Sequence, residues 1–142
     1  MSCAPGPVEV SYASQAEAEE RACAALVGDL PDRLAGEESR EVSPAQAPAA
    51  AWGDPPIVLT CGVGEPAELE LTSACEEIDG VGWFVPPAQL EDPARDVVLT
   101  TVGFEPAVSV AVPAAYRSDP TAITVPLARP ILESLDLVRP CA

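Results

Sequence analysis

Alternation of apolar and polar side chains predicts short β-strands in several parts of the chain. Residues 8–12 alternate strictly, which is the period-two pattern of a strand with one buried face. Residues 57–61 form a β-branched run that ends before Gly62. Such a run is typical of a strand buried on both faces, so we expect 57–61 to be central in a sheet.

Two further regions predict β-hairpins. Asp79 and Gly80 lie between two apolar segments, and this dipeptide favours a type I′ turn because both residues adopt positive φ at low cost. The second hairpin has a four-residue connection that contains Gly103. The four predicted strands are 75–78, 81–85, 96–102 and 107–112.

Near both ends of the domain, apolar residues recur with the spacing of a helix and no longer alternate with polar ones. Ser14 and Glu17 have the spacing of a capping box at a helix start, and Pro31 ends the regular helix. Near the C-terminus a second helix is predicted, although two prolines leave its first residue open. The apolar stripes are Cys23, Leu26, Val27, Leu30 and Leu34 in the first helix, and Leu127, Ile131, Leu135 and Val138 in the second.

Residues 36–56 fit neither template. The segment is rich in alanine and proline, and proline lacks an amide donor and keeps the preceding residue extended. We therefore expect a long, mostly extended connection, with a short strand at 40–43.

These elements predict an α+β fold. It consists of a mainly antiparallel sheet of four to six strands, an N-terminal helix and a C-terminal helix. The chain has 142 residues, enough for one hydrophobic core. We expect one domain at 8–142, preceded by a flexible tether at 1–7.

The cysteines indicate disulfide stabilisation. There are five, at 3, 23, 61, 75 and 141, and none forms a C-x-x-C pair, so a zinc ribbon or a thioredoxin-type motif is not expected. Cys3 lies in the predicted tether and is taken as the odd thiol. Several pairings of the others are open. The preferred one joins Cys23 to Cys61 and Cys75 to Cys141, and the alternative is a cytosolic protein with five reduced thiols.

Charge and composition exclude several classes of function. The net charge is −16, histidine is absent, and all cations are arginines. Nucleic-acid binding is not expected, because it requires clustered cations. Catalytic triads with histidine and Schiff-base chemistry with lysine are excluded within this chain.

Acidic residues are the remaining candidates for catalysis or metal binding. Asp54, Glu76, Glu77 and Asp79 include possible acid and base pairs for glycoside cleavage. Glu76 and Glu77, however, are neighbours on a predicted strand and should point to opposite faces. The sequence lacks a calcium loop and a phosphate loop. We therefore predict no catalytic residue, no metal site and no cofactor.

Aromatic residues give the one candidate binding site. Trp52 lies on a proline-flanked segment beside Asp54, and an aromatic residue with arginine is typical of recognition surfaces. We therefore consider a binding surface built from Trp52, Asp54 and Arg40, with a buried Trp52 as the alternative. For Trp83 we expect a core position, because the chain has few large side chains to fill its interior.

Specific strings in the chain resemble a known family. The string 50–63 contains Trp-Gly-Asp-Pro-Pro, and 79–84 contains Asp-Gly-Val-Gly-Trp-Phe. Together with weaker matches at 23–31, 100–103 and 110–113, these strings resemble an actinobacterial family of secreted proteins and lipoproteins catalogued as domain of unknown function 3515. The resemblance covers about 8–135.

The resemblance implies export across the cytoplasmic membrane, and it supplies no activity and no catalytic residue. It also implies lipidation of Cys3, since Ser2 is a small residue of the kind that precedes a lipidated cysteine, and the alternative is an ordinary terminal thiol. Lipidation there would hold the domain at the membrane surface, and no other membrane contact is expected.

The sequence thus favours a non-catalytic, extracytoplasmic module of the cell envelope that binds a protein or a cell-wall component. The alternative is a carboxylate-dependent enzyme that acts on extracellular glycans.

Overall fold

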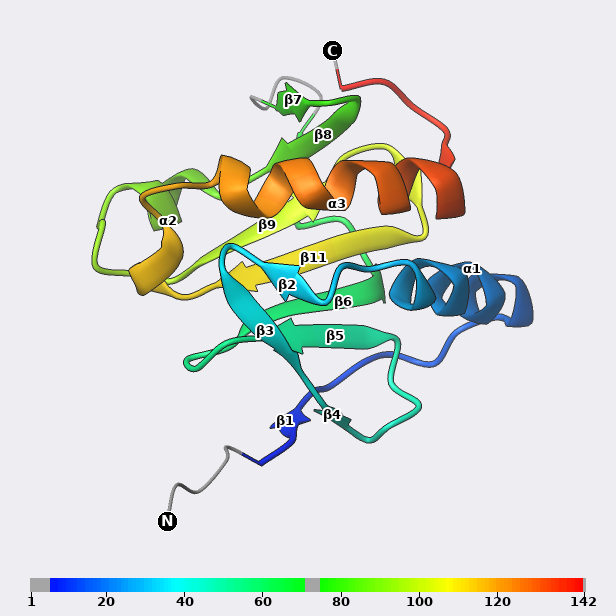
Figure 1. The fold of residues 1–142 in the computed structure, drawn as a ribbon. Helices are drawn as coiled ribbons and strands as arrows, with labels where there is room; N and C mark the ends of the chain where they lie inside the picture. Colours follow the sequence, from blue (N-terminus) through cyan, green and yellow to red (C-terminus); the bar gives the residue numbers. More distant parts are fainter. Residues whose placement is uncertain (1–5, 71–74, 142) are drawn as a thin grey trace.

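The computed structural model describes residues 6–70 and 75–141 and shows an α+β fold built on one large sheet (Figure 1). Eight strands pair antiparallel in the order β2-β3-β5-β6-β11-β9-β8-β7. The predicted α+β class is confirmed, but the sheet exceeds the expected four to six strands. In chain order, its strands are β2 (Arg33–Leu34), β3 (Glu37–Arg40), β5 (Ala49–Trp52), β6 (Ile57–Val63), β7 (Glu76–Ile78), β8 (Val81–Phe84), β9 (Val97–Thr101) and β11 (Ala107–Val112).

Two short strand pairs lie beside the large sheet. β1 (Val8–Glu9) runs parallel to β4 (Val42–Ser43). β10 (Phe104–Glu105) runs antiparallel to β12 (Asp136–Leu137). The first pair attaches the N-terminal segment, and the second attaches the segment that follows the last helix.

The helices α1 (Glu17–Gly28) and α3 (Thr121–Ser134) pack against each other and against the sheet. In Figure 1, α3 crosses in front of the sheet and α1 lies beside the end of β6. A single turn, α2 (Pro87–Leu90), and a 3₁₀ turn, η1 (Ala114–Tyr116), complete the fold. The core lies between the helices and the sheet. Its fully buried side chains include Leu26, Ile57, Leu59, Val110, Leu127 and Ile131.

The first helix does not begin with the predicted capping box. Ala16 is the N-cap residue, and no side chain caps the helix. Gln15, which lies between the two predicted capping residues, points toward β6, and its Nε2 atom donates a hydrogen bond to the Cys61 carbonyl at 3.0 Å. Of the predicted apolar stripe, Cys23 and Leu26 are buried on the helix, whereas Leu34 is buried in β2.

The C-terminal helix forms where it was predicted, although Pro126 and Pro130 both lie inside α3. Ile123, Leu127 and Ile131 repeat every four residues and are fully buried. This burial offsets the loss of two amide donors. Val138 was assigned to the same stripe, but it lies beyond the helix and is 56% exposed.

The connection predicted at 36–56 contains β5 and most of β3, which the sequence did not indicate, whereas the short strand predicted at 40–43 corresponds to β4 and the last residue of β3. β5 pairs with β6 on one side and with β3 on the other. Three of its four residues are alanines, which have little intrinsic strand propensity. The strand depends on its neighbours in the sheet, since β propensity mainly reflects cross-strand packing.

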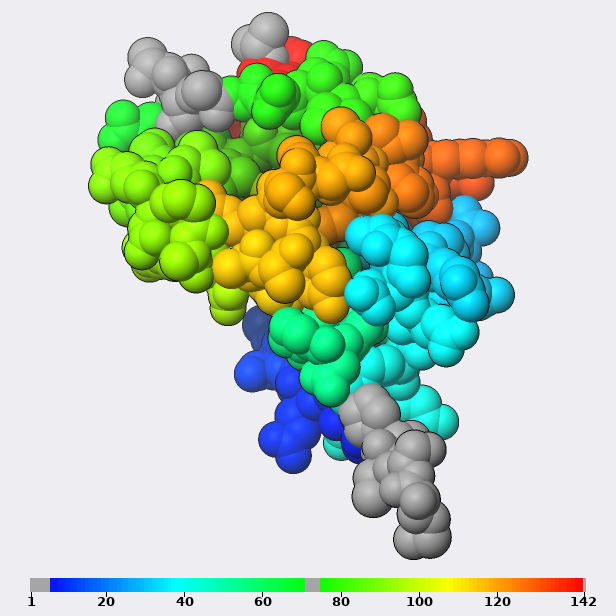
Figure 2. Space-filling model, turned by 60° about the vertical axis from the view of Figure 1, so that its left-hand side comes forward, coloured from blue at the N-terminus to red at the C-terminus, as the bar shows by residue number. Residues whose placement is uncertain are grey.

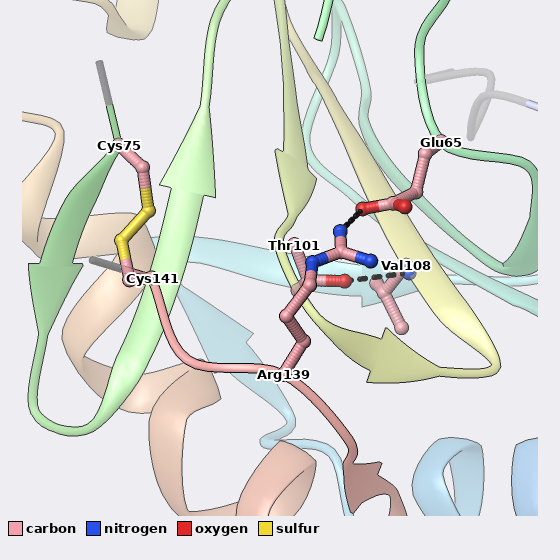
Figure 3. Close-up of polar contacts among 6 residues, drawn as sticks. All are labelled: Glu65, Cys75, Thr101, Val108, Arg139 and Cys141. Atoms are coloured by element: carbon pink, nitrogen blue, oxygen red, sulfur yellow. Dashed lines mark hydrogen bonds and ion pairs between the residues drawn. A yellow bond between two sulfur atoms is a disulfide. The ribbon is translucent and has the colours of Figure 1, made fainter. Parts of the chain in front are cut away.

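Both predicted hairpins are present. Asp79 and Gly80 have φ values of 51° and 91°, as a type I′ turn requires. In the second hairpin β9 pairs directly with β11. On the other side of β11, its pairing with β6 shifts register between Ala107 and Val108. At that shift the Val108 amide donates to Thr101 Oγ1 at 3.0 Å (Figure 3).

The preferred disulfide pairing is present. Cys23 and Cys61 join α1 to β6, with their Cα atoms 5.6 Å apart and both residues buried. Cys75 and Cys141 join the residue before β7 to the C-terminal segment (Figure 3), with their Cα atoms 5.9 Å apart. An ion pair between Arg139 and Glu65 holds the same segment.

Gly82 makes room for the second disulfide. A Cβ atom at this position would lie 2.7 Å from Cys141 Sγ and 3.0 Å from Cys75 Sγ. Both distances are shorter than van der Waals contact. The two sulfur atoms therefore pack directly against the backbone of β8, where Gly82 has no side chain.

Thiol counting tests the disulfides. We expect the oxidised chain, denatured without reductant, to take up one alkyl group, at Cys3, and to take up five after reduction, because the sequence has five cysteines. Intact mass spectrometry gives both numbers. Uptake of five groups without prior reduction, from protein made in an oxidising compartment, would contradict both disulfides.

Substitution of Gly82 tests the packing under the second disulfide. We expect Gly82→Ala to lower the free energy of unfolding by about 1–3 kcal/mol, because the added methyl group overpacks the sulfurs. Chemical denaturation measures this change. Gly64→Ala is the matched control, since a Cβ there would meet nothing within 4 Å, and an equal loss in both variants would contradict the argument.

Candidate functional site

The predicted binding surface of Trp52, Asp54 and Arg40 does not form around an exposed tryptophan. Trp52 is 1% exposed, and its Nε1 atom donates to the Pro31 carbonyl at 3.0 Å. It lies opposite Ile57 in the β5–β6 pair, on the face of the sheet that the helices cover. Its interpretation as a surface residue is therefore wrong, and it belongs to the core.

Arg40 and Asp54 remain near each other at the surface. The Arg40 guanidinium donates to the carbonyls of Gly53 at 2.8 Å and Gly6 at 2.7 Å, so it connects the N-terminal segment to the β5–β6 turn. Asp54 is exposed on that turn. Both residues line a shallow, polar depression, and without Trp52 this depression lacks the aromatic anchor that the prediction required.

The Trp-Gly-Asp-Pro-Pro string is a structural junction. Gly53 has φ of 80°, and a Cβ on it would lie 3.0 Å from the Glu37 side chain. Its amide donates to the Glu38 carbonyl at 3.0 Å. Tyr116 reaches the same turn and donates from its hydroxyl to the Pro55 carbonyl at 3.0 Å. Burial, with Glu37 and Asp54 nearby, raises the pKa of Tyr116.

The candidate carboxylates do not form a catalytic pair on β7. Glu76 lies opposite Trp83, whereas Glu77 lies opposite Gly82. Neighbouring residues of a strand point to opposite faces, as predicted for these two. Asp54 and Asp79 occupy separate turns, after β5 and after β7.

A pocket that the sequence did not indicate lies where the start of α3 meets the β7–β8–β9 end of the sheet. We call it the α3 pocket. Its volume is about 630 Å³, within the usual range for small-molecule sites. Figure 2 shows this side of the molecule, where α2, the β7–β8 hairpin and the start of α3 meet around a recess. Its apolar lining includes Ile78, Trp83, Leu90, Val97, Leu99 and Ile123.

Aromatic side chains are concentrated in this lining. Trp83, Phe84 and Tyr116 all line the α3 pocket, and the whole chain has only six aromatic residues. Trp83 is 4% exposed, which confirms its predicted core position, and its buried Nε1 atom has no acceptor among the described residues. The sequence feature that could have indicated this pocket is the cluster of apolar residues on β8 and β9. That cluster fits an ordinary hydrophobic core equally well.

Charged side chains lie at the edges of the α3 pocket. Glu68, Glu76 and Arg117 are the charged lining residues. Arg117 Nη1 donates to the carbonyls of Asp92 and Arg95. Arg117 thereby fixes the loop that follows α2 next to the pocket.

Residues 6–70 and 75–141 contain neither a metal centre nor a membrane-spanning helix. Among these residues, no group of three or more potential ligands is placed to hold a metal ion. No helix in the same ranges has the length and hydropathy to cross a bilayer. Cys3, the predicted lipidation site, lies outside the described residues.

The disulfides bear on compartment. Two disulfides in a small domain are typical of oxidising environments, and Cys23, Cys61, Cys75 and Cys141 are all paired. They therefore indicate an extracytoplasmic protein.

Comparison with known proteins identifies a family. No curated protein and no solved structure matches the chain. A family model described as "Protein of unknown function (DUF3515)" matches residues 1–138. This match covers nearly the whole chain, and the chain therefore belongs to the DUF3515 family, whose function is unknown.

Proposed function

We propose that this protein is a non-catalytic module of the extracytoplasmic cell envelope, either secreted or lipid-anchored through Cys3. It binds an envelope protein or a cell-wall component through the α3 pocket. The observation that carries this proposal is the open, largely apolar lining of that pocket, because solvated apolar surface of this kind is typical of binding sites.

Leu90 supports the proposal. It lines the α3 pocket and is nevertheless 58% exposed. Covering a large apolar side chain is worth about 1.5–3 kcal/mol, so an occupant of the pocket gains from contact with it. A ligand in the pocket would therefore bury apolar surface of Leu90 that is exposed to solvent in the folded protein.

The rigidity of the surroundings also supports a binding role. The Cys75–Cys141 disulfide holds the residue before β7, and Arg117 holds the loop after α2. Walls that are fixed before binding reduce the ordering cost of association.

A carboxylate-dependent enzyme that acts on extracellular glycans is the second candidate. Glu68 and Glu76 line the same pocket, and glycosidases use two carboxyl groups that face one substrate. The two candidates differ in outcome, since only the enzyme releases soluble glycan fragments.

Blocking the pocket tests the binding role. We expect the labelled protein to bind saturably to cell-wall sacculi or to solubilised membrane proteins from the organism that encodes it. Leu90→Glu should weaken this binding about tenfold or more, because a carboxylate is costly to bury against apolar groups. Sedimentation or fluorescence anisotropy measures the affinity, and mass spectrometry of the supernatant detects released glycan.

Leu137→Glu is the matched control, because Leu137 is 53% exposed and is not part of the α3 pocket. Retained binding in this control and weaker binding in Leu90→Glu support the proposal. Equal binding by both variants would overturn it, and release of glycan by the wild-type chain would favour the enzyme.

A further inference from the structure

We propose that the chemical group recognised by the α3 pocket is an organic cation with an apolar body, such as an alkyl- or arylammonium group. This inference rests on the binding role proposed above and names the group that an envelope component presents to the pocket, which a free monomeric ligand can present as well. The apolar lining receives the body of the ligand, and the carboxylate of Glu76 pairs with its cationic group.

The charges around the pocket favour a cation. Two of the three charged lining residues are acidic. Five more acidic residues are immediate sequence neighbours of lining residues, whereas Arg117 is the one arginine in the lining among the described residues. The five acidic neighbours are Glu77, Asp79, Glu91, Asp96 and Asp119.

The charge of the whole chain acts in the same direction. At a net charge of −16, the electrostatic field of the protein attracts cations to a concave site and slows the approach of anions. The same charge disfavours contact with anionic bilayers. These forces favour a monomeric ligand in solution over the surface of an anionic membrane.

The guanidinium of Arg117 is partly used within the protein. Its Nη1 atom donates to two backbone carbonyls, so this part of the guanidinium holds the loop. Trp83 lies opposite Glu76 in the β7–β8 pair, and both residues line the pocket. An aromatic residue beside the carboxylate favours a cation, because the face of an aromatic ring attracts positive charge.

Glu76 is the residue placed to select the cation. It is exposed, it lines the pocket, and it takes part in none of the four ion pairs found among the described residues. Glu77 is also exposed but lies on the opposite face of β7 and does not line the pocket. The two neighbours thus provide a carboxylate at the site and a matched carboxylate away from it.

Binding of three probes with one alkyl chain tests the charge preference in the full-length chain. The probes are octylammonium, octanol and octanoate, measured by calorimetry below their micellar concentrations. We expect octylammonium to bind most tightly and octanoate least, and we expect added salt to reduce the difference. Glu76→Gln should weaken octylammonium binding about twofold to fivefold. It should leave octanol binding unchanged, and Glu77→Gln should match the wild type.

Three results would overturn the inference: equal affinity for octylammonium and octanol, tighter binding of octanoate, or equal losses in Glu76→Gln and Glu77→Gln. Tighter binding to vesicles that contain phosphatidylethanolamine than to octylammonium would show that the cationic group comes from a lipid surface and not from a monomeric ligand. Failure of the cation preference is distinguishable from failure of the binding role. If only the cation preference is wrong, octanol still binds and Leu90→Glu still weakens octanol binding. If the binding role is wrong, none of the three probes binds.

Discussion

The covalent bond between Cys23 and Cys61 holds α1 against the sheet, and the closed core depends on it. α1 buries only Cys23 and Leu26, while its first turn carries Glu17, Glu19 and Glu20. By contrast, α3 buries six side chains, among them Ile123, Thr124 and Leu127. The noncovalent attachment of α1 is therefore weak, and a cross-link that closes a loop of 38 residues contributes about 4 kcal/mol in the chain-entropy model.

Local patterns were sufficient to predict the elements whose residues determine their own conformation. Asp79 and Gly80 require a tight turn, and the fourfold repeat of Ile123, Leu127 and Ile131 persists through two prolines. β5 was not predictable in this way, because its alanines become a strand only between β3 and β6. The predicted capping box of Ser14 and Glu17 does not form, because α1 begins after Ala16 and no side chain caps it.

The candidate site was less accessible from sequence than the fold. Trp52 and Trp83 have the same chemistry, yet Trp52 donates to the Pro31 carbonyl within the core and Trp83 lines the α3 pocket. The pocket depends on which strands and loops meet around Trp83, and these are far apart in the chain. By contrast, the string around Trp52 is distinctive because several backbone groups meet there: Gly53 and Pro55 both accept hydrogen bonds from side chains of other segments. In this chain the string therefore marks a structural feature of the fold and not a binding site.

The position of β7 at the end of the sheet also affects how molecules meet one another. An edge strand can pair with the edge of a second molecule and begin a growing ribbon. β7 is short, and Glu76 and Glu77 are exposed on its two faces. If two copies paired at this edge, their glutamates would bring like charges together on both faces. The β7 edge therefore disfavours aggregation when the protein is concentrated.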